Sequence, residues 1–367
     1  MEVALLGLMD NGPLLISSLI EYAGKFHGKT ELVSRSFSGK IERTNYSETL
    51  TRSKKLAQSL KKLGVKKGDI IGTLAWSNIR HFELYYGISG LGAICHTINP
   101  RLYKEQINFI INDAKDKYLF IDPDLIGLAD NVEHFPDKFS GIIVMCKRED
   151  MPSSKKIKDL ICYEDLIESE SGKFEWPIFE EQTASSLCYT SGTTGNPKGV
   201  LYAHRSTVIH SLAAAAPDAM NISARDVVMP VAPMFHANSW GIPYVATMVG
   251  SKIVFPGRHL DGESLQSLID NEKVTFTAAV PTVWLMLFDY LEKSGKKLTS
   301  LERCAIGGSA CPRSMMESFK EKYGVTVYHA WGMTETSPLG TINTPLAKHH
   351  NLNTKEILDL SVKQGRP

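Results

Sequence analysis

The most informative stretch of this chain is Tyr189-Thr190-Ser191-Gly192-Thr193-Thr194-Gly195-Asn196-Pro197-Lys198-Gly199-Val200. Its glycines allow backbone N–H groups to approach an anion closely, its hydroxyl groups can donate hydrogen bonds, and its lysine supplies a positive charge. Apolar residues lead into the stretch at 187–188 and out of it at 200–203. The composition therefore predicts a loop that holds the phosphate groups of a ligand.

Two other interpretations of this loop need to be weighed. The P-loop of kinases and GTPases requires a glycine, four residues, a second glycine, a lysine, and then serine or threonine. Counted from Gly192, the sixth position is Pro197, and Gly199 follows Lys198 where the hydroxyl should stand. The P-loop pattern therefore fails at two positions. A solvated hairpin loop is the other alternative, but such loops seldom combine this many donors with a lysine.

Three further motifs follow the loop along the chain. They read Pro233-Met234-Phe235-His236-Ala237-Asn238-Ser239-Trp240-Gly241, then Gly307-Gly308-Ser309-Ala310, then Tyr328-His329-Ala330-Trp331-Gly332-Met333-Thr334-Glu335-Thr336. In order and approximate spacing, the four motifs resemble those of the acyl-adenylate-forming superfamily, which includes acyl-CoA ligases, luciferases and peptide-synthetase adenylation domains. The resemblance runs from about Leu14 onward, and the opening residues 12–16 and 33–35 are similar to those of medium-chain fatty-acyl-CoA ligases and methylmercaptopropionyl-CoA ligases.

The resemblance implies an enzyme that joins a small carboxylic acid to ATP and then transfers the acyl group to coenzyme A, with Mg²⁺ as metal cofactor. A carboxylate with a pKa of about 4 is already ionised at neutral pH. The catalyst must therefore hold two anions in line and absorb charge on the α-phosphate. In the family the loop holds the β- and γ-phosphates, the position of Thr334 donates to the α-phosphate, and that of Glu335 binds the metal.

The expected site residues fall into three groups. The catalytic residues expected are Thr190, Lys198, Thr334 and Glu335, and Glu335 is also the expected metal ligand. Those expected at the nucleotide are Ser191, Gly192, Thr193, Thr194, Gly195, Gly308, Ser309, Ala310, Ala330, Trp331, Gly332 and Met333. Those expected to line the acyl pocket are His236, Ala237, Asn238, Trp240 and Gly307.

Several of these assignments depend on context. A Trp-Gly pair is commonly core plus turn, but the position of Trp331 before residues 333–335 favours packing on adenine. In the family a bulky residue at Gly332 shortens the acyl pocket, so glycine there implies an aliphatic acid of short-to-medium length. His236 is expected to be a pocket wall near the carboxylate, and no general base is assigned. His204 either anchors the exit of the loop or starts a surface helix.

Composition narrows the class of protein. The chain has 367 residues, 43% hydrophobic and 22% charged, as is typical of a globular protein. A net charge of +1 gives no clustered basic field, so no nucleic-acid or membrane partner is expected. Six scattered cysteines indicate a reducing compartment. Because we find neither a basic leader nor a run of 18 apolar residues, we expect a cytoplasmic protein without a membrane span.

Hydrophobic periodicity predicts an α/β protein. Asn45 and Glu48 form a capping box before an amphipathic helix over 46–63, and a second helix is expected over 79–90. Strands are expected at 69–75, 92–97, 119–121, 142–145, 227–229, 252–255 and 274–277. This alternation predicts mainly parallel sheets. The polar stretch 151–182 suggests two packed α/β subdomains, 1–180 and 181–367, the arrangement that the family's large N-terminal domain also has.

The chain ends at Gln364-Gly365-Arg366-Pro367, before the positions where the family has its ribose-binding aspartate, its hinge and its C-terminal lysine. We therefore expect the front part of a longer enzyme, without the small C-terminal domain and impaired in turnover. A non-catalytic nucleotide-binding protein and an aryl-acid or luciferase-type adenylating enzyme are the alternatives. The family often dimerises, so a homodimer is expected.

Overall fold

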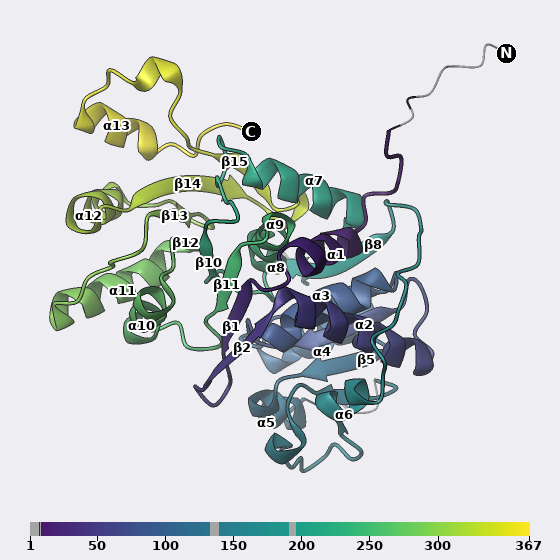
Figure 1. Cartoon of the computed structure of the whole chain (residues 1–367). Coiled ribbons are helices and arrows are strands. Elements are labelled where there is room, and N and C mark those ends of the chain that lie inside the picture. The colour runs from purple at the N-terminus through teal and green to yellow at the C-terminus, as the bar shows by residue number, and fades with distance from the viewer. Residues whose placement is uncertain (1–6, 8, 133–138, 191–195) are drawn as a thin grey trace.

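The computed structural model describes residues 7, 9–132, 139–190 and 196–367. Helices and strands alternate along most of these residues and build two sheets (Figure 1). In both sheets most neighbouring strands are parallel, and antiparallel pairs form only between β1 and β2, β8 and β9, and β14 and β15 among the strands described. The expected α/β class with mainly parallel sheets is confirmed.

The first sheet has seven strands in the order β7-β6-β5-β3-β4-β8-β9. Its strands are β3 (Ile70–Leu74), β4 (Ile94–Ile98), β5 (Tyr118–Ile121), β6 (Ile142–Val144), β7 (Ile161–Cys162), β8 (Ala184–Thr190) and β9 (Lys198–Ala203). The β8–β9 hairpin carries the phosphate-loop sequence between its strands, and Thr190 stands opposite Lys198 at its end. Residues 191–195 of the loop lie outside the described residues.

The second sheet has eight strands in the order β15-β14-β13-β12-β10-β11-β1-β2. Its strands are β1 (Glu31–Arg35), β2 (Ile41–Asn45), β10 (Val227–Pro230), β11 (Lys252–Phe255), β12 (Phe276–Ala279), β13 (Arg303–Ile306), β14 (Thr326–Gly332) and β15 (Leu339–Ile342). The strand expected at 274–277 begins two residues later, at Phe276, because Val274 and Thr275 lead into the sheet from helix α10.

The helices pack against these sheets and between them. They are α1 (Ile16–Phe26), α2 (Tyr46–Lys62), α3 (Ile79–Gly90), α4 (Lys104–Ala114), α5 (Ile126–Asp130), α6 (Tyr163–Glu168), α7 (His204–Ala215), α8 (Ala237–Trp240), α9 (Ile242–Val249), α10 (Gly262–Glu272), α11 (Pro281–Ser294), α12 (Arg313–Tyr323) and α13 (Thr354–Ser361). Short 3₁₀ turns are η1 (Pro123–Leu125), η3 (Arg148–Asp150), η4 (Thr334–Thr336) and η5 (Ala347–His349).

Helix α2 begins where its cap predicts. The Asn45 side chain accepts a hydrogen bond of 2.9 Å from the Glu48 N–H, which satisfies one of the free donors of the first turn. The reciprocal half of the capping box is absent, because the Glu48 carboxylate accepts from the Thr44 hydroxyl instead, at 2.9 Å. Helix α3 is capped in the same way by Asn78, which accepts from the His81 N–H at 2.9 Å.

The two sheets exchange strands across residue 180. Strands β1 and β2 come from the start of the chain but extend the second sheet, whereas β8 and β9 follow residue 180 and complete the first. One hydrophobic core cluster also includes residues of both sheets together with α1, α3 and α9. The division into packed subdomains 1–180 and 181–367 remains a prediction, and neither sheet is built from only one of these two ranges.

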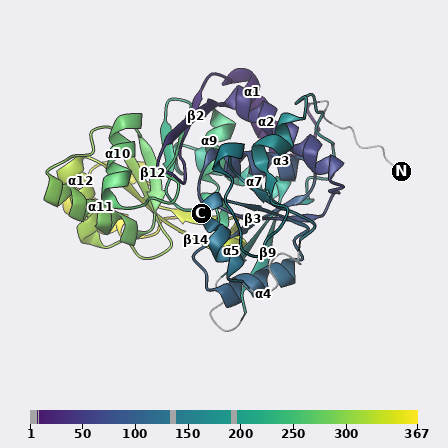
Figure 2. The same cartoon turned by 90° about the horizontal axis from the view of Figure 1, so that it is seen from below.

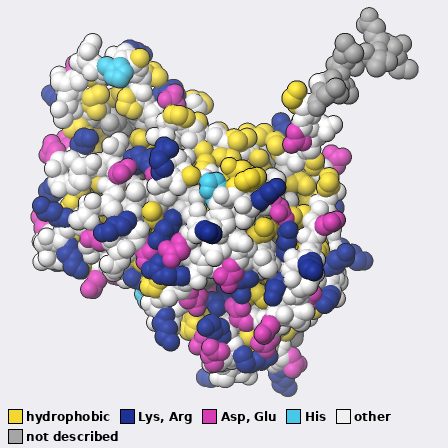
Figure 3. All heavy atoms as spheres, in the orientation of Figure 1, with side chains coloured by type: hydrophobic (Ala, Val, Ile, Leu, Met, Phe, Trp, Pro, Cys, Tyr) yellow, Lys and Arg dark blue, Asp and Glu magenta, His cyan; other side chains and the backbone are white. Residues whose placement is uncertain are grey.

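The molecule has two lobes, as the view from below shows (Figure 2). One lobe carries α10, α11 and α12, and the other carries α2 to α5. Hydrophobic side chains gather on the surface where α7 and α1 lie next to each other (Figure 3). The large exposed hydrophobic residues of α1 and α7 are Tyr22, Phe26, Ile209 and Leu212.

Candidate active site

A narrow cavity of about 70 Å³ opens where β13 and β14 end beside α8. Because β12, β13 and β14 are parallel neighbours, their carboxyl ends meet at one edge of the sheet, which is where open α/β sheets bind ligands. The residues that line the cavity are Met220, His236, Ala237, Trp240, Ala305, Gly307, Gly308, Ala330, Trp331, Gly332, Met333, Thr334, Pro338 and Leu339. Residues of three of the four sequence motifs thus come together in one place.

The two glycines after β13 allow the backbone to pass close to its neighbours. Gly308 has φ +75°, and a Cβ there would lie 2.9 Å from a methyl carbon of Val280. A Cβ on Gly307 would lie 3.0 Å from the Ala330 carbonyl oxygen. Side chains at these positions would push β14 or the Val280 segment away from the cavity. Ser309 and Ala310, which follow, are exposed and are not among the lining residues.

Gly332 has a backbone reason to be glycine. The ladder between β14 and β15 is irregular at Trp331 and Gly332, and a Cβ on Gly332 would stand 2.1 Å from the Pro338 carbonyl oxygen. That oxygen also accepts a hydrogen bond of 3.1 Å from the Met333 N–H. From the sequence, Gly332 was expected to leave space for the acyl chain. In the structure, the close approach of Pro338 already requires glycine at this position. Trp331 is 42% exposed and presents its ring at the cavity.

Helix α8 is a left-handed turn. Ala237, Asn238, Ser239 and Trp240 have φ values of 45°, 51°, 55° and 56°, and Gly241 continues with 72°. Each non-glycine residue in this conformation costs about 1–2 kcal/mol, so the surroundings must impose it. The Ser239 hydroxyl donates to the Ala232 carbonyl oxygen. The Asn238 amide donates to the Ser186 hydroxyl at 2.8 Å.

Because of this turn, only some of the predicted acyl-pocket residues face the cavity. His236, Ala237 and Trp240 line the cavity, whereas Asn238 is buried behind it and contacts β8. Asn238 therefore holds the turn and does not face the cavity, because the left-handed conformation directs its amide to Ser186. No local sequence pattern indicates such a turn apart from Gly241. The lining residues Met220, Pro338 and Leu339 were also missed, because they belong to no motif.

A second cavity, of about 170 Å³, meets the first at His236 and is lined by Tyr189, Thr190 and Pro197 as well. The phosphate-loop flank and the narrow cavity are therefore neighbours. Of the expected loop residues, Ser191 to Gly195 lie outside the described residues. The Lys198 side chain is exposed at the start of β9.

Thr334 and Glu335 form the start of η4, directly after the cavity-lining end of β14. Thr334 lines the cavity, and the Glu335 side chain is exposed beside it. Within the described part of the chain, no three histidine, cysteine or acidic side chains gather as a metal cage. A single carboxylate suits Mg²⁺, because this ion is commonly held by one or two carboxylates together with substrate phosphates.

His236 and His204 have different surroundings. His236 is exposed at the junction of the cavities, although the protein around it desolvates the ring and lowers its pKa. His204 begins α7 but is buried, and its Nδ1 accepts from the Ile16 N–H at 3.1 Å. Burial lowers the pKa of His204 to about 4. The surface-helix interpretation of His204 is therefore wrong, because α1 covers the ring.

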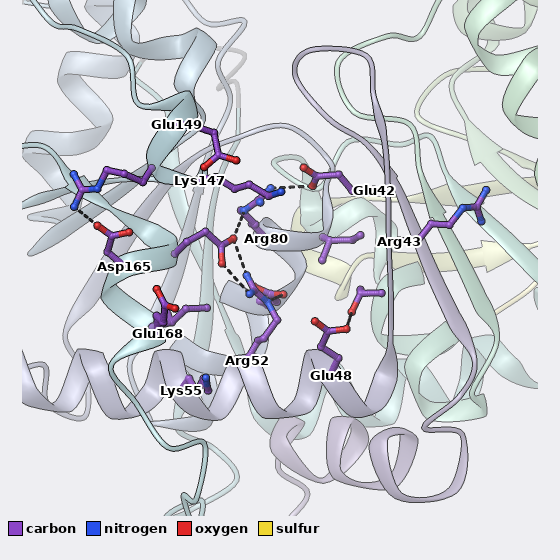
Figure 4. Close-up of a pocket in the computed structure, with 16 residues that line it drawn as sticks. Glu42, Arg43, Glu48, Arg52, Lys55, Arg80, Lys147, Glu149, Asp165 and Glu168 are labelled. Atoms are coloured by element: carbon purple, nitrogen blue, oxygen red, sulfur yellow. Dashed lines mark hydrogen bonds and ion pairs between the residues drawn. The ribbon is translucent and has the colours of Figure 1, made fainter.

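A much larger cavity, of about 720 Å³, lies away from these motifs (Figure 4). Arg52 in its wall pairs with Glu83 at 2.5 Å and Glu164 at 2.9 Å. Arg80 pairs with Glu42 at 2.9 Å and with Glu164 at 2.8 Å. These ion pairs connect β2, α2, α3 and α6. Because the arginines already have carboxylate partners, we do not assign this cavity as an anion site. We interpret the ion pairs in its wall as links between the two sheets.

Fold and cavity together define the large domain of an acyl-adenylate-forming enzyme. Residues 19–361 match the family described as AMP-binding enzyme. The chain belongs to this AMP-binding enzyme family. None of the helices in the described residues combines the length and hydropathy that crossing a bilayer requires.

Individual relatives agree with this assignment. The chain is 51% identical over 363 residues to a 3-methylmercaptopropionyl-CoA ligase of Ruegeria lacuscaerulensis, covering 99% of this chain and 67% of that protein. It is 49% identical to a medium-chain-fatty-acid–CoA ligase of Ectopseudomonas oleovorans, covering 99% and 66%. A long-chain-fatty-acid-CoA ligase from Archaeoglobus fulgidus superposes with a TM-score of 0.81 at 25% identity, covering 100% of this chain and 72% of that one. The chain spans about two thirds of the length of the first two relatives.

Proposed function

We propose that this chain binds ATP and an aliphatic carboxylic acid and activates the acid as an acyl-adenylate, which then acylates coenzyme A. The observation that carries the proposal is the single narrow cavity in which His236, Gly308, Trp331 and Thr334 meet. The relatives named CoA ligases support the same reaction.

The first step needs positioning more than acid–base chemistry. A carboxylate oxygen of the acid attacks the α-phosphorus of ATP, the bond to the pyrophosphate oxygen breaks, and pyrophosphate leaves without net proton transfer. Thr334, which lines the cavity, is the proposed donor to an α-phosphate oxygen, and Lys198 at the hairpin end is the proposed positive charge for the outer phosphates. Bound Mg²⁺ would neutralise charge on the phosphates, and Glu335 is the residue proposed to hold it.

In the second step the sulfur of coenzyme A attacks the acyl carbon. The bond from that carbon to the AMP oxygen breaks, AMP leaves, and the thiol proton is released. The exposed His236 lines both cavities and is the residue proposed to form a wall beside the reacting carboxyl group. Desolvation lowers its pKa and keeps the ring neutral at pH 7, so it adds no positive charge beside the acyl carbon.

The names of the relatives support medium-chain or methylthio-alkanoic acids as substrates. Small residues at Ala237 and Gly307 leave the walls of the cavity without bulk. We further propose a homodimer, as the resemblance implies, in the cytoplasm, as the scattered cysteines indicate. Light scattering of the purified chain tests the dimer, and a molar mass near 40.7 kDa would exclude it.

The proposal is tested with hexanoyl-sulfamoyl-adenosine, a stable mimic of the acyl-adenylate. Calorimetry of the full chain is expected to show tighter binding of this mimic than of hexanoate or AMP. Thr334→Ala should weaken the mimic about threefold to tenfold, the effect of one lost hydrogen bond. Thr326→Ala is the matched control, because Thr326 is exposed at the opposite end of β14. No binding by the unmodified chain would overturn the proposal, and tighter binding of a benzoyl mimic would overturn the aliphatic assignment.

A further inference from the structure

Tyr189 is the penultimate residue of β8, directly before Thr190 and the phosphate-loop residues. Its hydroxyl donates a hydrogen bond of 2.7 Å to the Asp113 carboxylate near the end of α4. Burial, reinforced by Asp113, raises the pKa of Tyr189. The phenol therefore stays protonated at neutral pH and remains a donor. The end of β8 is thus connected to a helix on the neighbouring part of the sheet.

The buried pair of His96 and Asp116 lies next to the Tyr189 ring. His96 on β4 directs its Nδ1 to the two oxygens of Asp116 at 2.8 and 2.9 Å, and both side chains are fully shielded from solvent. The ring centroid of His96 lies 5.2 Å from that of Tyr189. The other nitrogen of the imidazole, Nε2, is buried and has no hydrogen-bond partner among the described residues. Because Asp116 holds one end of the ring, the imidazole presents a fixed surface to Tyr189.

The partner strand closes the remaining side. A Cβ on Gly199 would lie 3.3 Å from the Tyr189 Cζ and 3.0 Å from a Leu187 methyl carbon. Gly199 therefore lets β9 pass directly over the tyrosine ring. Three neighbours hold Tyr189: Asp113 at its hydroxyl, His96 at its face and the Gly199 backbone on the hairpin side.

We propose that Tyr189, held between Asp113, the buried His96–Asp116 pair and Gly199, is a positioning residue that fixes the start of the phosphate loop and so sets the affinity for the β- and γ-phosphates of ATP. The inference rests on the proposed function, because it assigns those phosphates to the loop. It adds a residue that acts on the loop through Thr190. Its effect should be confined to ligands that carry the outer phosphates.

The test compares two ligands on one set of variants of the full chain. Calorimetry measures the Kd of ATP with Mg²⁺ and the Kd of hexanoyl-sulfamoyl-adenosine, which lacks the β- and γ-phosphates. Tyr189→Phe removes only the hydroxyl and is expected to raise the Kd of ATP about threefold to tenfold. The Kd of the adenylate mimic should change by less than about twofold. Asp113→Asn keeps an acceptor for the hydroxyl and should retain most of the ATP affinity.

A double-mutant cycle and a matched variant separate positioning from general loss of stability. Tyr189→Phe combined with Asp113→Ala should be no weaker for ATP than either single variant, because both remove the same hydrogen bond. Tyr118→Phe is the control, since Tyr118 on β5 of the same sheet donates a comparable bond of 2.9 Å to the Leu63 carbonyl oxygen, away from the loop. It should leave both affinities unchanged.

These measurements distinguish failure of the proposed function from failure of the positioning role of Tyr189. Failure of the unmodified chain to bind the adenylate mimic would overturn the proposed function itself. Binding of the mimic together with an unchanged ATP affinity in Tyr189→Phe would overturn the positioning role alone. A parallel loss of affinity for both ligands would also overturn it, because the effect would then be a general distortion of the site.

Discussion

Replacing Gly332 with alanine separates two explanations of this glycine. A Cβ there would lie 2.1 Å from the Pro338 carbonyl oxygen, whereas ordinary contact begins at 3.4 Å, so the two atoms must separate by roughly 1.3 Å. Overpacking of this kind costs about 1–3 kcal/mol. Moving the oxygen also weakens the bond it accepts from the Met333 N–H, worth about 0.5–1.5 kcal/mol. We therefore expect Gly332→Ala to lose about 2–4 kcal/mol of unfolding free energy.

Guanidinium unfolding measures this loss, and Gly127→Ala is the control. Gly127 lies on α5 with open space around its Cβ position, so alanine there should be neutral or slightly stabilising. Binding of acetyl and hexanoyl adenylate mimics supplies the second readout. A backbone clash should weaken both mimics alike, whereas a shortened acyl pocket should weaken only the hexanoyl one. Unchanged stability with selective loss of the hexanoyl mimic would refute the clash as the reason for glycine.

Other expected outcomes follow from the buried polar groups. Arg52→Met should destabilise the chain by about 3–5 kcal/mol in urea unfolding, because it leaves the fully buried Glu83 without its ion partner; adding Glu83→Gln should recover much of the loss, and failure to recover would contradict this. Asn238→Ala should lower thermal stability more than Asn238→Gly, because both lose the bond to Ser186 but only alanine resists φ +51°. Equal losses would mean that the left-handed turn imposes little strain. Burial lowers the pKa to about 4 at His81, His204 and His210. Below pH 6.5 these histidines therefore become protonated in the unfolded chain but stay neutral in the folded chain. The free energy of unfolding should fall between pH 6.5 and 4 by about 1.4 kcal/mol per pH unit for each histidine. His210→Phe should reduce that slope by one such increment, and an unchanged slope would show that the residue does not stay neutral.

The sequence predicted those parts of the fold that local signals determine. Asn45 caps α2 as expected, and α3 begins at the expected residue, where Asn78 caps it. Strands β3, β4, β5, β6, β10, β11 and β12 were predicted from their apolar runs, because strands buried on both faces carry no alternation, whereas β1, β7, β8, β13 and β14 were not predicted. The pairing of β1 with β11 was not predicted, since which sheet a hairpin joins depends on contacts across more than 200 residues of chain.

In the candidate site too, local motifs indicated some residues, whereas others depend on contacts made only in the folded chain. Gly308, Trp331 and Thr334, which the motifs assign to the nucleotide and to catalysis, line one cavity, and their roles remain predictions. The sequence could not show that Asn238 faces away from the cavity, because nothing in the order Ala-Asn-Ser-Trp specifies a left-handed turn. That turn is imposed by β8 and by Ala232, which reach it only in the folded chain.

The exchange of strands between the sheets has a consequence for synthesis on the ribosome. Strand β1 pairs with β2 nearby in the chain, but its other neighbour, β11, is more than 200 residues further along, with Leu32 opposite Ile253. At a translation rate of roughly 5–20 residues per second, β11 is made on the order of ten seconds or more after β1. During that interval the β1–β2 hairpin has an open edge, and a two-stranded hairpin is marginally stable in water. Strands β1 and β2 therefore cannot join the second sheet until β11 has left the ribosome.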